Sequence, residues 1–218
     1  MDEQGYGQYI HEQIEKWPMG KPVTNTAVAT SMANAFGIDI DRAKKVTNVN
    51  MKRLADKGEL SRVHRGVYGK VKNTSFGKVT PPPDDMLAEI LLHDGISVIG
   101  YVTGPTLLNR LGLCIPIPAD RHIATNRYRF RPLENTRIRI CKPILTVNDE
   151  NAPYWQALEA FIAMEQYYVD ADRPDEVLRA ILQDNNIDNE KLVLFARRHC
   201  GHKTLLKTIN IALGGKLP

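Results

Sequence analysis

The sequence has few cysteines, no long apolar run and no strongly acidic or basic balance overall. Its 218 residues include three scattered cysteines, Cys114, Cys141 and Cys200, with no CxxC pair. An odd number of this kind argues against a disulfide framework and favours a reducing compartment, so we expect a cytoplasmic protein. No apolar stretch approaches the length of a membrane span and the polar opening residues do not resemble a signal peptide, so we expect no membrane association.

The sequence also lacks the common nucleotide-binding and catalytic motifs: GxGxxG, GxxxxGK[ST], GxSxG and HExxH are all missing. The run His199-Cys200-Gly201-His202 suggests a metal site, but such sites generally need four convergent ligands and the other cysteines lie far away in sequence. Two histidines at a helix end and a buried thiol explain it more simply. We therefore predict no catalytic residues, no metal and no cofactor, with an enzyme whose site lies in residues 84–147 as an alternative.

Positive charge is concentrated in one part of the chain. The formal net charge is +4, yet residues 21–78 hold twelve lysines or arginines against four acidic residues, a net of +8. The segments 1–20, 79–150 and 151–218 have net charges of −3, 0 and −1. This distribution is typical of one nucleic-acid-binding module joined to a part of different function.

Within the basic segment, residues 41–71 predict a helix followed at once by a β-hairpin. Asp41 is a residue type that caps helices, Gly58 would end the helix, and Gly66 suits the hairpin turn. Two further helical patterns precede it, giving the order helix, helix, turn, helix, hairpin. That order predicts a winged helix-turn-helix domain over residues 1–75, which would place its third helix in the major groove of double-stranded DNA.

The faces of the predicted third helix follow from a rotation of 100° per residue. Ala43, Thr47, Asn50, Met51 and Leu54 share the side that would pack on the preceding helix. The other side and the hairpin supply the candidate DNA contacts, which are Lys45, Asn48, Val49, Lys52, Arg53, Arg62, His64 and Arg65. Cations suit phosphate or guanine, an amide suits adenine, and a small apolar group suits the thymine methyl. A solvated helix face is the alternative; an exposed Val49 and the charge continuing into the hairpin favour nucleic acid.

Residues 72–83 read as a linker because they are polar and end in three consecutive prolines. We expect a second domain at 84–218, with helices and strands up to about residue 147, among them a buried strand at 96–99, and a helical bundle at about 150–218. The predicted fold class is therefore α+β: an N-terminal winged helix-turn-helix, a mixed α/β domain and a C-terminal helical bundle.

Arginines alternate with apolar residues in two strand-like segments of the second domain. Period-two alternation would place Tyr128, Phe130, Ile138 and Ile140 on one sheet face. The opposite face would carry Arg127, Arg129, Arg131, Arg137 and Arg139. This face is either a docking surface for RNA or an acidic protein, or a solvated sheet whose arginines pair with nearby acids; both interpretations stay open.

Two stretches together resemble a known protein family. The first, within residues 54–68, contains KGEL and RGVY; the second, residues 100–113, contains LLNRLGL and is followed by His122 to Asn126. In this order they resemble AbiEi-type antitoxins, over roughly residues 5–145. The chain departs from the family pattern at Thr47 and Asn50, where family members usually carry more apolar residues.

The resemblance implies a DNA-binding transcriptional repressor that binds its own promoter and autoregulates a toxin–antitoxin operon. It also implies that the second domain counters a nucleotidyltransferase-like toxin encoded nearby, directly or indirectly. By analogy with other winged-helix repressors, a homodimer would read paired half-sites. The alternative is an adaptor whose winged helix binds protein and whose arginines hold RNA or an acidic partner.

Overall fold

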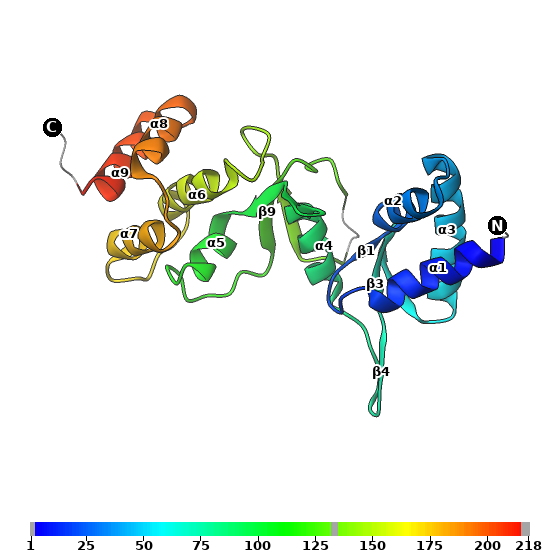
Figure 1. Ribbon diagram of the computed structural model, residues 1–218. Coiled ribbons are helices and arrows are strands. Elements are labelled where there is room, and N and C mark those ends of the chain that lie inside the picture. The colour runs from blue at the N-terminus through cyan, green and yellow to red at the C-terminus, as the bar shows by residue number, and fades with distance from the viewer. Residues whose placement is uncertain (1–2, 132–134, 215–218) are drawn as a thin grey trace. The chain divides into compact units, whose positions relative to one another are not determined.

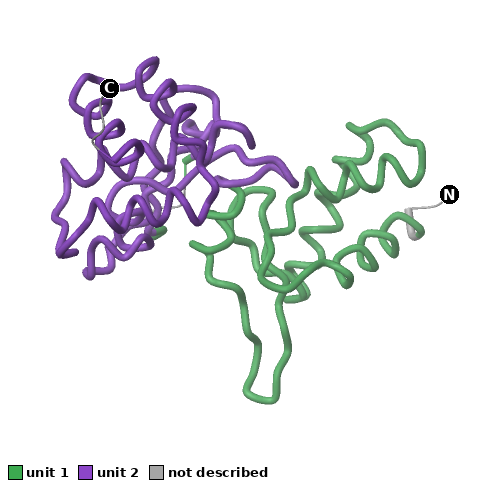
Figure 2. The backbone as a smooth tube through the Cα atoms, turned by 60° about the vertical axis from the view of Figure 1, so that its left-hand side comes forward, with its two compact units in different colours: residues 1–90, 131–136 green, residues 91–130, 137–218 purple. Residues whose placement is uncertain are grey.

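The protein has a mixed α+β fold, as the sequence predicts. The computed structural model describes residues 3–131 and 135–214 (Figure 1). Its contacts divide the chain into a first unit, residues 1–90 with 131–136, and a second unit, residues 91–130 with 137–218 (Figure 2). Each unit has its own hydrophobic cluster.

The first unit begins with three helices and a small antiparallel sheet. In chain order the elements are α1 (Glu3–Lys16), β1 (Val23–Thr24), α2 (Asn25–Phe36), α3 (Ile40–Asp56), β2 (Leu60–His64) and β3 (Val67–Lys70). The sheet order is β1-β3-β2, so β2 and β3 form a hairpin whose second strand also pairs with β1. This places the start of α2 directly beside the hairpin turn.

Short polar side chains and glycines set the helix ends in this unit. The Thr24 hydroxyl accepts the Ala27 N–H at the start of α2. The predicted cap of α3 at Asp41 is wrong: Asp39 is the cap, and one of its carboxylate oxygens accepts the N–H groups of Asp41 and Arg42 at 2.9 and 3.1 Å. Both aspartates are good capping types, and the helix begins at the earlier one.

The core of the first unit lies between the helices and the sheet. Ile10, Met32 and Met51 are fully buried, one from each of the three helices, and Leu60 and Tyr68 bring in the hairpin. Burial of one apolar side of each helix stabilises their packing and fixes which side of α3 faces solvent.

The segment predicted as a linker contains a second hairpin, β4 (Lys72–Thr74) with β5 (Gly77–Val79). The Thr74 hydroxyl donates to the Gly77 carbonyl at 2.8 Å and accepts the Phe76 N–H at 3.3 Å, which closes the turn. Polar composition does not separate such a hairpin from a linker. The hairpin extends away from the helices of its unit (Figure 1), and Phe76 at its tip is fully exposed.

The second unit combines short strands with helices, and α4 (Pro83–Leu92) leads into it. Its elements are β6 (His93–Asp94), β7 (Ser97–Val98), β8 (Gly100–Val102), α5 (Gly104–Arg110), β9 (Arg121–Thr125), β10 (Ile138–Cys141), α6 (Ala152–Gln166), α7 (Pro174–Asp184), α8 (Asn189–His199) and α9 (His202–Ala212). The sheet order is β10-β9-β8, with β9 antiparallel to β8 and parallel to β10. The predicted C-terminal helices are confirmed, and Leu108, Trp155, Phe161 and Leu192 are buried in the core that they share with α5.

One strand prediction for this unit is right only in part, and another is wrong. The sequence predicts a buried strand at 96–99; Ser97–Val98 do form β7, but neither residue is buried, and Ile96 lies 99% exposed in the turn between β6 and β7, next to Gly95 with φ of 63°. Residues 127–130 form a turn instead of an alternating strand. The turn begins at Asn126, whose side-chain amide nitrogen donates to the Val147 carbonyl and whose side-chain oxygen accepts the Val147 N–H, each at 2.8 Å. A long-range side-chain contact therefore overrides the period-two pattern here.

Candidate nucleic-acid interface

The exposed side of α3 carries the side chains that the sequence singles out. Ala43, Thr47, Met51 and Leu54 are buried, while Asn50 is half-buried and its amide donates to the Val46 carbonyl at 2.9 Å. The predicted outward-facing residues of the helix are all exposed: Lys45, Asn48, Val49, Lys52 and Arg53. The helical register inferred from spacing is therefore confirmed.

Val49 is an apolar side chain in the middle of this polar face. It is 50% exposed, on the same turn as Asn48. Single exposed apolar residues are common on protein surfaces and need no partner. Here, however, Val49 lies beside the exposed Asn48 amide, with Lys45 and Lys52 one turn away on either side. In that setting a small apolar side chain is suited to contact a thymine methyl.

The cations of this face lack acidic partners in the part of the chain that the structure describes. Lys45, Lys52, Arg53, Arg62 and Arg65 are exposed, and within residues 3–131 and 135–214 none of them has an acidic partner within 4.0 Å. Lys44 of the same helix differs, because it pairs with Asp41 at 3.3 Å. Five cations without acidic partners on one helix and the following hairpin give this part of the unit a positive field that would attract a polyanion.

Asn25 connects the outer face of α3 to the hairpin turn. Its side-chain amide donates to the Asn48 side-chain oxygen at 2.5 Å, and its backbone N–H donates to the Gly66 carbonyl at 2.9 Å. Asn48 and the Arg65–Gly66 turn therefore lie on the same side of the unit. The sequence marks Asn25 only as a capping residue, since its contacts with α3 and the turn are long-range and leave no local signal.

The hairpin brings the remaining predicted residues to this side. Arg62 lies on β2 opposite Tyr68, and Arg65 occupies the turn with Gly66, whose φ is 74°. His64 is half-buried, and its Nε2 lies 3.1 Å from the Arg131 carbonyl oxygen. Arg62 and Arg65 are thus accessible to a ligand, whereas one ring nitrogen of His64 already contacts the Arg131 carbonyl.

The five arginines of the second predicted site are not brought together on one sheet face. Arg139 is the one that lies in a strand; Arg127 lies in the turn after β9, where it pairs with Asp94 at 2.9 Å. The Arg129 guanidinium lies 5.6 Å from the ring centroid of its neighbour Tyr128. Arg131 belongs to the first unit and Arg137 immediately precedes β10. The expected sheet face is therefore wrong, while docking by individual arginines stays a prediction.

A half-buried carboxylate organises a second group of polar residues. Glu159 of α6 accepts hydrogen bonds from the Thr103 hydroxyl at 2.6 Å and the Tyr101 hydroxyl at 3.4 Å. Burial first, and the Glu159 charge second, raise the pKa of Tyr101 above its ordinary value. Burial likewise raises the pKa of the Cys141 and Cys200 thiols, with Glu159 adding to it. At neutral pH these thiols stay protonated, which disfavours their use as nucleophiles.

Of the candidate metal ligands near residue 200, His199 packs against aromatic rings of the core. The His199 ring lies 5.6 Å from the ring of Trp155 and 4.9 Å from that of Phe195, measured between centroids. His202 is exposed at the start of α9. Among the described residues, no group of three or more histidines, cysteines and acids is arranged to hold a metal ion.

No protein-family model matches the chain, and no curated protein is significantly similar to it. The resemblance to AbiEi-type antitoxins therefore stays a prediction from the quoted motifs. Among the described residues, no helix is both long and apolar enough to cross a membrane.

Proposed function

We propose that residues 3–71 act as a winged helix-turn-helix that binds double-stranded DNA. The observation that carries the proposal is the set of exposed cations without acidic partners on α3 and the β2–β3 hairpin, next to the Asn48 amide. The order of helices and strands and the three-stranded sheet support it, because a winged helix combines a groove-reading third helix with an adjacent hairpin.

In this proposal, α3 lies in the major groove. Lys45, Lys52 and Arg53 contact phosphates or guanine, Asn48 reads an adenine edge and Val49 touches a thymine methyl. Arg62 and Arg65 of the hairpin bind the flanking backbone. Lysine and arginine supply most of the affinity, and Asn48 supplies sequence preference.

The proposed biological role is that of an antitoxin-type repressor of its own operon. It rests on the KGEL, RGVY and LLNRLGL motifs and on the DNA-binding proposal. A gene for a nucleotidyltransferase-like protein directly beside this one, whose toxicity is relieved by co-expression of this chain, is the expected finding. Unrelieved toxicity would remove the antitoxin role and leave DNA binding to be judged separately.

The first test is a binding titration of the full chain against duplex DNA from its own upstream region. A scrambled duplex and an RNA of matched sequence serve as competitors at several salt concentrations. We expect tight, sequence-selective binding to the upstream duplex. Weak binding that is equal for all three and is lost at moderate salt would contradict the proposal and favour a protein-docking adaptor.

Point variants test the assigned contacts. Lys45→Ala and Lys52→Ala should each weaken binding to every duplex and reduce the slope of log affinity against log salt by about 1, as expected for one lost phosphate contact. Asn48→Ala should reduce the ratio of affinities for the upstream and scrambled duplexes by a larger factor than it reduces the overall affinity for DNA. Lys191→Ala on α8 is a matched control for loss of charge, and its binding should equal that of the unmodified protein.

A further inference from the structure

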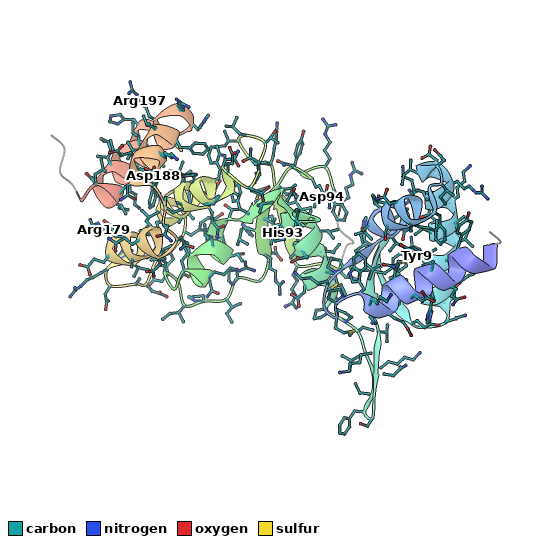
Figure 3. All side chains as sticks on the ribbon, in the orientation of Figure 1. Tyr9, His93, Asp94, Arg179, Asp188 and Arg197 are labelled. Carbon is teal, nitrogen blue, oxygen red and sulfur yellow. The ribbon has the colours of Figure 1, made fainter. Side chains whose placement is uncertain are left out.

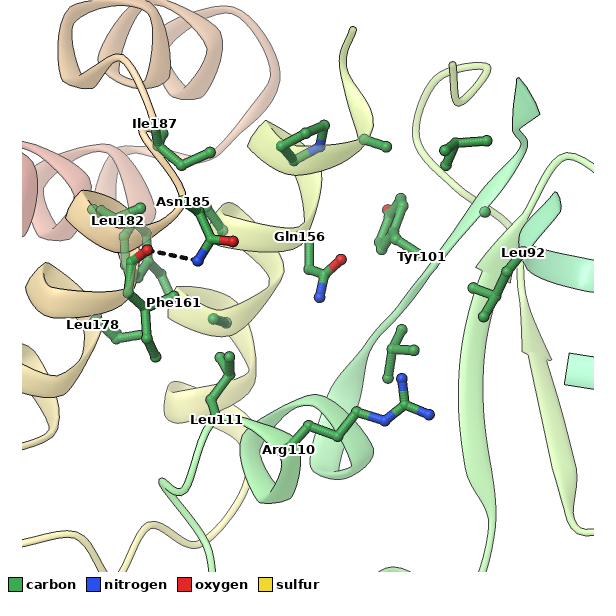
Figure 4. Close-up of a pocket in the computed structure, with 18 of the residues that line it drawn as sticks. Leu92, Tyr101, Arg110, Leu111, Gln156, Phe161, Leu178, Leu182, Asn185 and Ile187 are labelled. Atoms are coloured by element: carbon green, nitrogen blue, oxygen red, sulfur yellow. Dashed lines mark hydrogen bonds between the residues drawn. The ribbon is translucent and has the colours of Figure 1, made fainter. Parts of the chain in front are cut away.

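The second unit contains a pocket of about 460 Å³ that the DNA-binding proposal does not use (Figure 4). It is lined by residues of β8, α5, α6 and α7 and of the segments next to them. Its volume lies in the range of cavities that enclose small organic molecules.

Much of the pocket lining is apolar and buried. It includes Tyr101 on the β8 side of α6 and Phe161, Leu178 and Leu182 on the α7 side (Figure 4), together with Ala160. Contacts with these side chains would remove the apolar part of a ligand from water, which is the main source of affinity in such sites.

Two polar side chains of the lining, the exposed Arg110 and the half-buried Gln156, have no partner among the residues that the structure describes. Arg110 at the end of α5 and Gln156 on α6 project into the space between α6 and β8 (Figure 4). Within the described ranges, neither side chain makes a hydrogen bond or an ion pair. Asn185, by contrast, donates to the Ile181 carbonyl at 2.8 Å, and an Asp149 oxygen accepts the Val98 N–H at 2.9 Å.

We propose that this pocket binds a small carboxylate with an apolar body. The Arg110 guanidinium binds the carboxylate with two parallel N–H donors, and the Gln156 amide donates a further hydrogen bond. The apolar body lies against Tyr101 and the other apolar residues that line the space between α6 and β8. This proposal is independent of DNA binding, because every residue that it uses lies in the second unit.

Asp149 is the one acidic residue of the lining, and it defines the competing ligand. A ligand that used Asp149 instead of Arg110 would carry an amine. Probes of equal length with different head groups separate the two, so decanoate, decanol and decylamine are the molecules to compare.

The experiment is a calorimetric titration of the full chain with each of these three probes. Decanoate should bind in a 1:1 complex and more tightly than decanol or decylamine. Arg110→Gln should weaken decanoate binding by about 10- to 100-fold, the worth of a hydrogen bond to a charged group. Arg197→Gln is the matched control, since Arg197 lies on α8 away from the pocket lining and points outward (Figure 3); it should bind decanoate like the unmodified protein.

A second variant tests the location of the ligand. Ala157, half-buried on α6, lines the pocket, and Ala157→Phe places a ring in the cavity, so it should weaken all three probes. Circular dichroism confirms that each variant is folded. Equal decanoate affinity in Arg110→Gln and the unmodified protein, tighter binding of decylamine, or no decanoate binding at millimolar concentration would each overturn the proposal.

Discussion

Asn25 contributes to the proposed interface without carrying charge. Its side chain holds the Asn48 amide at 2.5 Å, and its backbone holds the hairpin turn through Gly66. Asn25→Ala removes the first of these bonds and leaves the second in place. Because the Asn48 amide is then free to rotate, we expect a smaller ratio of affinities for the upstream and scrambled duplexes. The salt dependence of binding should change little, and the competition titration described above measures both.

The double variant Asn25→Ala/Asn48→Ala separates positioning from direct contact. If Asn25 acts through Asn48, the double variant should show the same sequence preference as Asn48→Ala alone, since the two effects share one contact. Additive losses would instead indicate that Asn25 contacts DNA itself.

His122 gives the second unit a dependence on acidic pH. Burial first, and the Arg139 charge second, lower its pKa below the ordinary value of 6.5, while Asp120 opposes the shift. The folded state therefore favours the neutral ring, and this contribution to stability is present above pH 6.5 and lost as the pH falls below it. Urea unfolding followed by Trp155 fluorescence should show a larger loss of stability between pH 7.5 and 5.5 for the unmodified protein than for His122→Asn.

The exposed His202 is the matched control for this experiment. His202→Asn should keep the pH dependence of the unmodified protein. If His122→Asn shows the same loss of stability as the unmodified protein, another group is responsible for the acid sensitivity.

The two hairpins of the first unit differ in how much they add to stability. Leu60 of β2 is 2% exposed and packs in the core, so Leu60→Ala should lower the free energy of unfolding by about 2–5 kcal/mol. Phe76 at the tip of the β4–β5 hairpin is fully exposed, so Phe76→Ala should leave Tm unchanged. Thermal unfolding followed by circular dichroism checks both, and a clear fall in Tm for Phe76→Ala would show that the tip packs on something in solution.

Helices were predicted from the sequence far better than strands. The spacing of apolar residues predicted which side of α3 is buried, and the capping residues placed the two ends of this helix to within two residues. Short strands failed for two reasons. The strand pattern of residues 127–130 was overridden by the hydrogen bonds between Asn126 and Val147. The hydrophobic character of Ile96 predicted a buried strand residue, whereas Ile96 lies exposed in a turn. The Asn25–Asn48 contact and the Arg110 pocket depend on long-range packing, which local patterns do not contain.

At the scale of the whole molecule, each of the two hydrophobic clusters contains or contacts one tryptophan. Trp17 packs against the cluster of the first unit, and Trp155 is fully buried in that of the second. Met32→Ala removes buried volume from the first unit alone. It should lower the unfolding midpoint reported by Trp17 and leave the midpoint reported by Trp155 unchanged.

Single-tryptophan variants make this measurement direct. Trp155→Phe breaks no hydrogen bond, because the Trp155 indole N–H has no partner among the described residues, so its cost should be limited to the packing volume lost from the core. Trp17→Phe leaves Trp155 as the reporter. Equal shifts of both midpoints in the Met32→Ala background would show that the two units unfold as one cooperative body.

The β4–β5 tip also makes the chain open to controlled proteolysis. Phe76 is followed by Gly77 in an exposed turn, and exposed loop tips are preferred sites of nicking. Chymotrypsin, which cuts after aromatic residues, should cleave after Phe76 before it reaches the buried aromatic rings; Tyr168, 74% exposed just after α6, is the competing site. The cut would separate residues 1–76 from the remainder of the chain, so the amino-terminal fragment could be assayed for duplex binding without designing a truncation.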